Sequence, residues 1–129
     1  MATFRSFEEI EGWQKARLLV REIYAISNRE PFAKDFALRD QMRRAGVSVM
    51  SNIAEGFGRD GTREFVQFLA MAKGSVNEVK AQLYVAIDQG YISQQDFDRL
   101  LALTDEIGGM IGGLMRYLQQ ANVKGTKYK

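Results

Sequence analysis

Two stretches of this chain repeat apolar residues at alternating intervals of four and three, and this spacing constrains the fold more than any other feature. The first runs from Phe65 to Ala86 and the second from Phe97 to Leu118. Residues three or four apart lie on one face of an α-helix, and such an alternation is typical of the seam of a left-handed helical bundle. The sequence therefore predicts two long helices that belong to a bundle.

Two earlier stretches have the same helical character. Residues 6–28 place apolar side chains on one face, and Pro31 disfavours helical geometry in the residue before it, so this helix should end near residues 28–30. Residues 37–57 carry a second inward stripe, and no stretch shows the period of two that marks a strand. Because short connections make neighbouring helices antiparallel, we expect an all-α, antiparallel up-down-up-down four-helix bundle. The inward stripe of the second helix is Leu38, Met42, Ala45, Val49 and Ile53.

Helix termini are predicted from a few polar residues and one glycine. Ser6 with Glu9 three residues later forms a capping-box pattern, and Thr62 and Ser93 are favourable N-cap residues. Gly90 is the expected C-terminal stop of the third helix.

Length and composition indicate a single domain. The chain has 129 residues, 46% of them hydrophobic, and at this size about two-thirds of the unfolded surface can be buried without disulfides or a metal. We expect the domain to span residues 1–120 and residues 121–129, which are basic and lack periodicity, to form a disordered tail. No apolar run approaches about 18 residues and no signal-peptide pattern is evident, so a cytoplasmic protein without membrane contact is expected.

The chain contains no histidine and no cysteine. Zinc sites, haem ligation, the Glu-x-x-His di-iron motif and imidazole-activated nucleophiles all need one of them, so we expect no enzymatic activity, catalytic residue, metal or cofactor. The string from Gly56 to Gly61 matches G-x-G-x-x-G. That fingerprint works only as a turn from strand to helix, whereas a predicted helix precedes it here, so we interpret it as a connection between helices.

Basic residues gather on the second and third predicted helices, although the net charge is only +2. In an antiparallel hairpin centred near residue 60, residue 44 lies about level with residue 76, so lysines at 73 and 80 should come alongside the arginines. Free N–H groups at the start of the third helix also favour a phosphate. A phosphate-binding stripe is therefore expected, with a solvated helix surface as the alternative. The predicted contacts are Arg39, Arg43, Arg44, Arg59, Arg63, Lys73 and Lys80, with Lys124, Lys127 and Lys129 of the tail adding non-specific attraction.

Apolar residues outside the seams predict a subunit interface, because soluble monomers rarely expose large contiguous apolar patches. A thicker, tilted core is the alternative. Glycines at 108, 109, 112 and 113 would let another helix approach closely or would weaken this helix locally. The predicted interface residues are Val47, Met50, Ala54, Phe57, Leu101, Leu103, Met110 and Met115.

Several blocks of sequence carry a resemblance to a known family: residues 13–16, 41–45, 51–59, 64–65, 68–69 and 72–75, together with Glu78. With these blocks, the chain resembles the proteins encoded in intervening sequences of bacterial 23S ribosomal RNA genes, also called the S23 family, and the resemblance extends to about Leu118. It implies an antiparallel four-helix bundle that assembles as a homopentameric barrel without known catalytic activity. The chain is also similar to accessory proteins of diversity-generating retroelements, in which a basic pentamer binds a reverse transcriptase and RNA.

Taken with the basic residues, the resemblance favours a non-enzymatic oligomeric scaffold or accessory protein that binds the backbone of RNA or DNA. The alternative is a protein-interaction module that docks a reverse transcriptase or another polymerase without binding nucleic acid itself. A small-molecule or enzymatic role would require a polar, converging pocket, which the sequence does not indicate.

Overall fold

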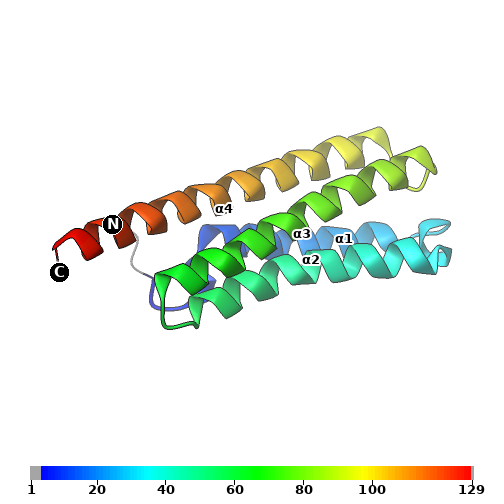
Figure 1. Cartoon of the computed structure of the whole chain (residues 1–129). Coiled ribbons are helices and arrows are strands. Elements are labelled where there is room, and N and C mark those ends of the chain that lie inside the picture. The colour runs from blue at the N-terminus through cyan, green and yellow to red at the C-terminus, as the bar shows by residue number, and fades with distance from the viewer. Residues whose placement is uncertain (1–3, 129) are drawn as a thin grey trace.

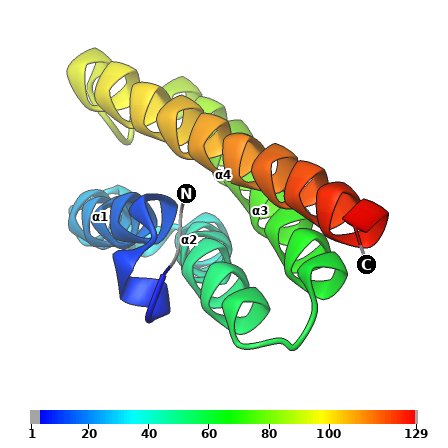
Figure 2. The same cartoon turned by 90° about the vertical axis from the view of Figure 1, so that its left-hand side faces the viewer.

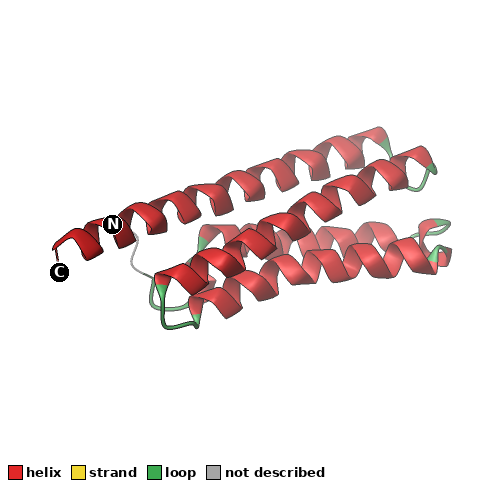
Figure 3. Cartoon of the chain, in the orientation of Figure 1, coloured by secondary structure: helices red, strands yellow, loops and turns green. Residues whose placement is uncertain are grey.

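The computed structural model describes residues 4–128, except for the side chains of residues 122–128. Every regular element in this part of the chain is a helix (Figure 3). The predicted all-α class is therefore confirmed. Two 3-10 turns, Phe7–Glu9 and Phe32–Lys34, precede the first and second long helices. The long helices are α1 (Glu11–Ser27), α2 (Phe36–Phe57), α3 (Thr62–Asp88) and α4 (Gln94–Tyr128).

Successive helices run in opposite directions, as the colour gradient in Figure 1 shows. Each helix packs against the helices before and after it, and α1 also contacts α4, so the four form a closed ring around one core. Figure 2 shows α3 and α4 on one side of the molecule and α1 and α2 on the other. The C-terminal end of α4 projects past the start of α3 (Figure 1).

The core confirms the apolar seams. The inward stripe predicted for α2 is buried throughout, and the seams of α3 and α4 are buried except at the ends, where Phe65, Leu114 and Leu118 are half-buried. These positions recur every three or four residues and so face one direction from each helix. The buried seam residues are Leu69, Ala72, Val76, Val79, Leu83 and Ala86 on α3, and Phe97, Leu100, Thr104, Ile107 and Ile111 on α4.

Two of the three predicted N-caps differ from the structure. Ser6 makes no capping hydrogen bond through its side chain, and α1 begins further along the chain, after a 3-10 turn. Gly61, rather than the predicted Thr62, is the N-cap residue of α3. Ser93 caps α4 as predicted, because its hydroxyl accepts a hydrogen bond from the backbone N–H of Asp96 (3.0 Å).

The α1–α2 and α3–α4 connections meet at one end of the bundle. The ring of Phe32 stacks on Tyr91, with centroids 5.2 Å apart, and the Tyr91 hydroxyl donates to Asp35 (2.9 Å). The other carboxylate oxygen of Asp35 accepts from the backbone N–H of Leu38 (3.2 Å) and so caps α2. The hydrogen bond from the Tyr91 hydroxyl to Asp35 raises the pKa of Tyr91. Gly90 has a φ of 72°, which confirms it as the C-terminal stop of α3.

Helix α4 continues past residue 120, where we expected the domain to end. The backbone of residues 121–128 is helical, which differs from the disordered tail that the composition predicts. A nucleated helix gains one hydrogen bond for each residue added, and this segment contains no proline. The side chains of Lys124 and Lys127, and the whole of Lys129, lie outside the described part of the chain.

An ionic network ties the end of α1 to the start of α4. Asp96 pairs with Arg99 (2.9 Å) and with Arg29 (3.1 Å), and Arg99 also reaches Glu22 on α1 (2.8 Å). The hydrogen bond from Arg99, followed by that from Arg29, holds the pKa of Asp96 below its usual value. The carboxylate is mostly shielded, with 15% of its side chain exposed, so water screens these pairs less than it screens fully exposed ones.

Helices α2 and α3 approach each other closely where Gly56 faces Phe68. A Cβ at position 56 would lie 2.6 Å from the Cβ of Phe68 and 3.0 Å from the ring of Phe65. The Cβ of Phe68 is fixed to its backbone, so it cannot move aside without moving α3. Position 56 therefore requires glycine for packing.

We expect Gly56→Ala to lower the free energy of unfolding by about 1–2 kcal/mol. Overpacking costs about 1–3 kcal/mol, and the better helix propensity of alanine returns up to about 1 kcal/mol. Gly74→Ala on α3 is the matched control, because nothing lies within 4 Å of a Cβ there, and it should be neutral or stabilising. Chemical denaturation measures both, and a Gly56→Ala variant as stable as Gly74→Ala would contradict this packing.

We expect Asp96→Asn to lower stability at neutral pH and to weaken the loss of stability in acid. The pKa of Asp96 is lowered in the folded state, so its contribution is present above the ordinary aspartate pKa and is lost as the pH falls through the folded value. Thermal unfolding between about pH 2 and 7 tests this. Glu78→Gln removes an exposed carboxylate of α3 and is the control; acid profiles that coincide for wild type and Asp96→Asn would rule out the linkage.

Candidate nucleic-acid interface

Arg39 is held by its own surroundings at the start of α2. Its Nη1 donates to the carbonyl of Ala33 (3.1 Å), its Nε pairs with Asp40 (2.9 Å), and its guanidinium carbon lies 4.8 Å from the ring centroid of Phe36. The hydrogen bond from Arg39 is the main cause of the lowered pKa of Asp40. Arg39 therefore fixes the turn before α2 and neutralises the neighbouring carboxylate.

Of the predicted arginines on α2, Arg43 and Arg44 are the two that form no ion pair with a carboxylate in the described part of the chain. Arg43 is anchored to α1: its Nε donates to the hydroxyl of Ser27 (2.9 Å), and its guanidinium carbon lies 4.5 Å from the ring centroid of Tyr24. Arg44 is exposed, and neither arginine lies within 4.0 Å of a carboxylate oxygen in the described part of the chain. We call the shallow hollow lined by Tyr24, Asp40, Arg43, Arg44 and Val47 the arginine surface.

The arginines on either side of the α2–α3 turn have different environments. Arg59 pairs with Glu55 (3.1 Å), and its guanidinium carbon lies 4.9 Å from the ring centroid of Phe68. Arg63 is exposed in the first turn of α3. The structure thus gives Arg59 a local partner and leaves Arg63 open to solvent.

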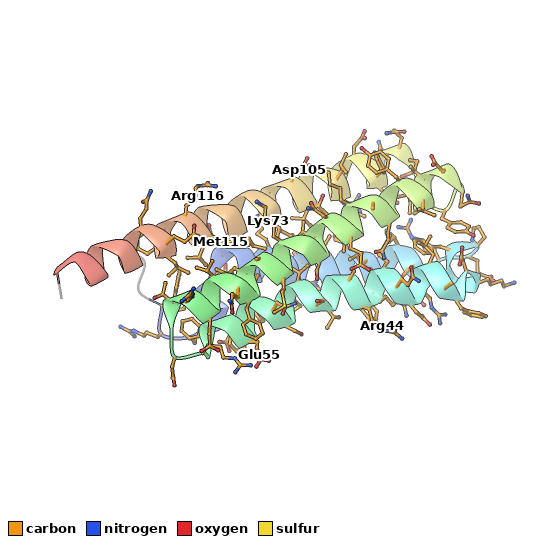
Figure 4. All side chains as sticks on the ribbon, viewed as in Figure 1. Arg44, Glu55, Lys73, Asp105, Met115 and Arg116 are labelled. Carbon is orange, nitrogen blue, oxygen red and sulfur yellow. The ribbon has the colours of Figure 1, made fainter. Side chains whose placement is uncertain are left out.

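Lys73 and Lys80 face α4 rather than the arginines of α2. Lys80 pairs with Asp105 of α4 (2.7 Å), and the Nζ of Lys73 lies beside Gly112 of the same helix. In Figure 4, Lys73 and Asp105 lie where α3 meets α4, whereas Arg44 lies at the opposite edge of the molecule. The continuous stripe of cations that we predicted across α2 and α3 is therefore not formed. The prediction considered only the position of each residue along the helix axis, which does not determine the side of α3 on which its side chain lies.

Most of the residues predicted to form a subunit interface pack against the chain's own core. Val47 is 40% exposed, and Ala54 and Met110 are half-buried. Met110 also lines an apolar cavity of about 200 Å³ between the N-terminal segment and the bundle. The thicker core that we considered as an alternative thus accounts for much of the apolar surplus, and self-association stays a prediction. The predicted interface residues that are half-buried and packed on the core are Met50, Phe57, Leu101, Leu103 and Met115.

An exposed strip on α3 is a feature that our sequence reasoning missed. Met71 and Val85 are 49% and 45% exposed, and Gly74, Ala81 and the exposed Glu78 lie between them on the same strip. This strip repeats the three-and-four spacing of the buried seam but is shifted by two residues, which places it about on the opposite side of the helix. A search for a second alternation would have found it.

The described residues offer no cluster of three metal-ligating side chains. Within the same part of the chain, no helix has the length and apolar character needed to cross a membrane.

The model of one protein family, the 23S rRNA-intervening sequence protein, matches residues 8–113. The chain belongs to this family. A solved structure described as a protein of unknown function from the S23 ribosomal protein family of Bacteroides thetaiotaomicron has a similar fold, with a TM-score of 0.74 and 22% sequence identity over 81% of this chain and 97% of that one. No curated protein matched the chain.

In this member of the 23S rRNA-intervening sequence protein family, part of the block that carried the resemblance joins α2 to α3. The side-chain amide of Asn52 donates to the carbonyl and hydroxyl of Ser48 (2.9 and 3.0 Å). Ser75 of α3 donates to the same hydroxyl (2.9 Å). Together with the close approach at Gly56, these contacts give the block a packing role.

Proposed function

We propose that this member of the 23S rRNA-intervening sequence protein family is a non-enzymatic scaffold that binds the phosphate backbone of RNA or DNA through its arginine surface. The observation that carries the proposal is the charge balance there: the carboxylate of Asp40 is already paired with Arg39, so Arg43 and Arg44 have no carboxylate partner among the residues that the structure describes. Guanidinium groups bind phosphate oxygens with strong, paired hydrogen bonds.

The anchoring of Arg43 supports a contact with phosphate rather than with bases. Its guanidinium is held against Tyr24 and Ser27, so it is fixed before any ligand arrives and loses less entropy on binding. Contacts to phosphate position a protein on nucleic acid but carry no sequence information. Binding at the arginine surface is therefore expected to be independent of sequence and to weaken steeply with salt.

We expect Arg44→Gln to weaken binding of a fluorescent single-stranded RNA and to reduce the slope of log affinity against log salt by about one contact, which is about 0.7 units for a single strand. Lys80→Gln changes the net charge by the same amount, but Lys80 already pairs with Asp105, so its effect should be smaller. Fluorescence anisotropy at several salt concentrations measures both. Equal effects of the two variants would show that only net charge matters, and binding that ignores salt would overturn the proposal.

Self-association is the second part of the proposal, and the exposed strip of α3 is the surface that would support it. Met71 and Val85 cost free energy when they face water, and Gly74 and Ala81, on either side of Glu78, would let another helix approach closely. The partner we propose is a second copy of the chain, and the resemblance to the family implies five copies. A reverse transcriptase or another polymerase is the competing occupant of the same strip.

We expect light scattering to find an oligomer that the double variant Met71→Lys with Val85→Lys breaks into smaller species. The matched control changes two other exposed apolar residues, Leu18→Lys with Phe36→Lys, and should leave the assembly intact. A wild-type protein that is monomeric at micromolar concentration would remove self-association from the proposal. An assembly that only the control variant disrupts would show that the strip is the wrong surface.

A further inference from the structure

Two cations from different helices converge on one glycine at the junction of α3 and α4. A Cβ at Gly112 would lie 3.5 Å from Nη1 of Arg116 and 3.6 Å from Nζ of Lys73. The two nitrogens are therefore at most about 7 Å apart. A Cβ at Gly113 would lie 3.9 Å from Nη2 of Arg116, so the guanidinium lies back over the glycine pair of its own helix. Figure 4 shows Lys73 and Arg116 near each other on this side of the bundle.

No carboxylate in the described part of the chain neutralises this pair of cations. Among the described side chains, neither Lys73 nor Arg116 has a carboxylate oxygen within 4.0 Å, and Asp105 of α4 is paired with Lys80. From Ile107 onward the sequence contains no aspartate or glutamate at all. The charged side chains in this C-terminal part of α4 are therefore all positive, and none of them can form an ion pair with Lys73 or Arg116.

Like charges at this distance repel each other, and an anion between them turns the repulsion into two attractions. Hydrogen bonds from Arg or Lys to a phosphate oxygen are about 2.7–2.9 Å long, so different oxygens of one phosphate group can reach both nitrogens. The lysine supplies a point charge and the arginine a planar fork, a combination suited to a group with several equivalent oxygens.

The glycines beside the pair leave space for the rest of a ligand. Nothing lies within 4 Å of a Cβ at Gly108 or Gly109, so the surface of α4 next to the cations is free of covering side chains. In Figure 4 the pair lies on the α3–α4 side, at the opposite edge of the molecule from Arg44. The site is thus separate from the arginine surface and does not depend on it.

We propose that Lys73 and Arg116 form a binding site for a phosphate group, seated between their cationic nitrogens above Gly112. Arg116 is a phosphate-binding residue that the sequence analysis did not select, because sequence spacing on α4 alone does not reveal a partner on α3. The phosphate is either a free ion or one unit of a nucleic-acid backbone, and the two sources present the same oxygens.

The decisive experiment measures the thermal unfolding midpoint of the full chain against added inorganic phosphate at constant ionic strength, with oligouridylate as a second probe. Stabilisation by inorganic phosphate that is lost in Lys73→Gln and Arg116→Gln would identify a site for a free ion. Stabilisation by oligouridylate alone would identify a backbone site at this pair only where Lys73→Gln and Arg116→Gln lose it and Arg44→Gln keeps it, and an oligouridylate response that only Arg44→Gln loses would overturn the proposal. A wild-type protein that responds to neither probe would overturn it. We expect Lys73→Gln and Arg116→Gln each to weaken the effective affinity at least about tenfold, the size of one lost charge-assisted hydrogen bond, and Arg44→Gln to retain the response to inorganic phosphate.

A pair of glycine variants separates the site from general charge effects. Gly112→Asp would place a carboxylate between the two cations and should abolish the response to phosphate while preserving the fold. Gly109→Asp adds the same charge to the same helix but faces open space, and it should retain the response. If Gly112→Asp does not fold, Lys73→Gln and Arg116→Gln still test whether the two cations bind phosphate. Equal responses in wild type, Lys73→Gln and Arg116→Gln would overturn the proposal.

Discussion

The packing of α3 between α2 and α4 is the contact on which the rest of the structure depends. One strip of α3, from Leu69 to Ala86, is buried in the core, and this fixes the rotation of the helix about its axis. Once the rotation is fixed, each of the other strips of α3 faces one defined side of the bundle. Ser75 faces α2 and bonds to Ser48, whereas Lys73 faces α4 beside Gly112. The distribution of charge over the molecule follows from the burial of apolar side chains.

The features that depend on one helix at a time could be predicted from the sequence. The four helical stretches, the buried stripes, the Ser93 cap and the Gly90 stop all follow from local spacing or local chemistry. Features that depend on the relative rotation of two helices could not. Lys73 and Lys80 do share one strip, as their spacing of seven requires, but that strip lies against α4 and not against α2. The same limit hid Arg116, whose partner is on another helix.

The apolar surplus of α4 shows why counting exposed positions on an isolated helix overestimates an interface. Leu101, Leu103 and Met115 flank the seam, yet they pack on the core because the neighbouring helices and the N-terminal segment cover more than one strip of α4. The edge-to-face contact between Phe7 and Trp13, with centroids 5.1 Å apart, lies in that segment. Met71 and Val85 stay exposed on α3 because they lie about opposite its seam, away from the core.

The two positive sites lie on different sides of one bundle, and this separation decides what each can do. A helix with its side chains is about 10–12 Å wide, so two layers of helices span about 20 Å, which is twice the screening length of about 8–10 Å at physiological salt. The electrostatic fields of the arginine surface and of the Lys73–Arg116 pair are therefore nearly independent. A nucleic acid that neutralises both must curve around the subunit or bridge two copies, whereas a free phosphate needs only the pair above Gly112. The ion pair between Lys80 and Asp105 adds to this separation. Because Asp105 neutralises Lys80, the uncompensated positive charge at the α3–α4 junction is concentrated at Lys73 and Arg116.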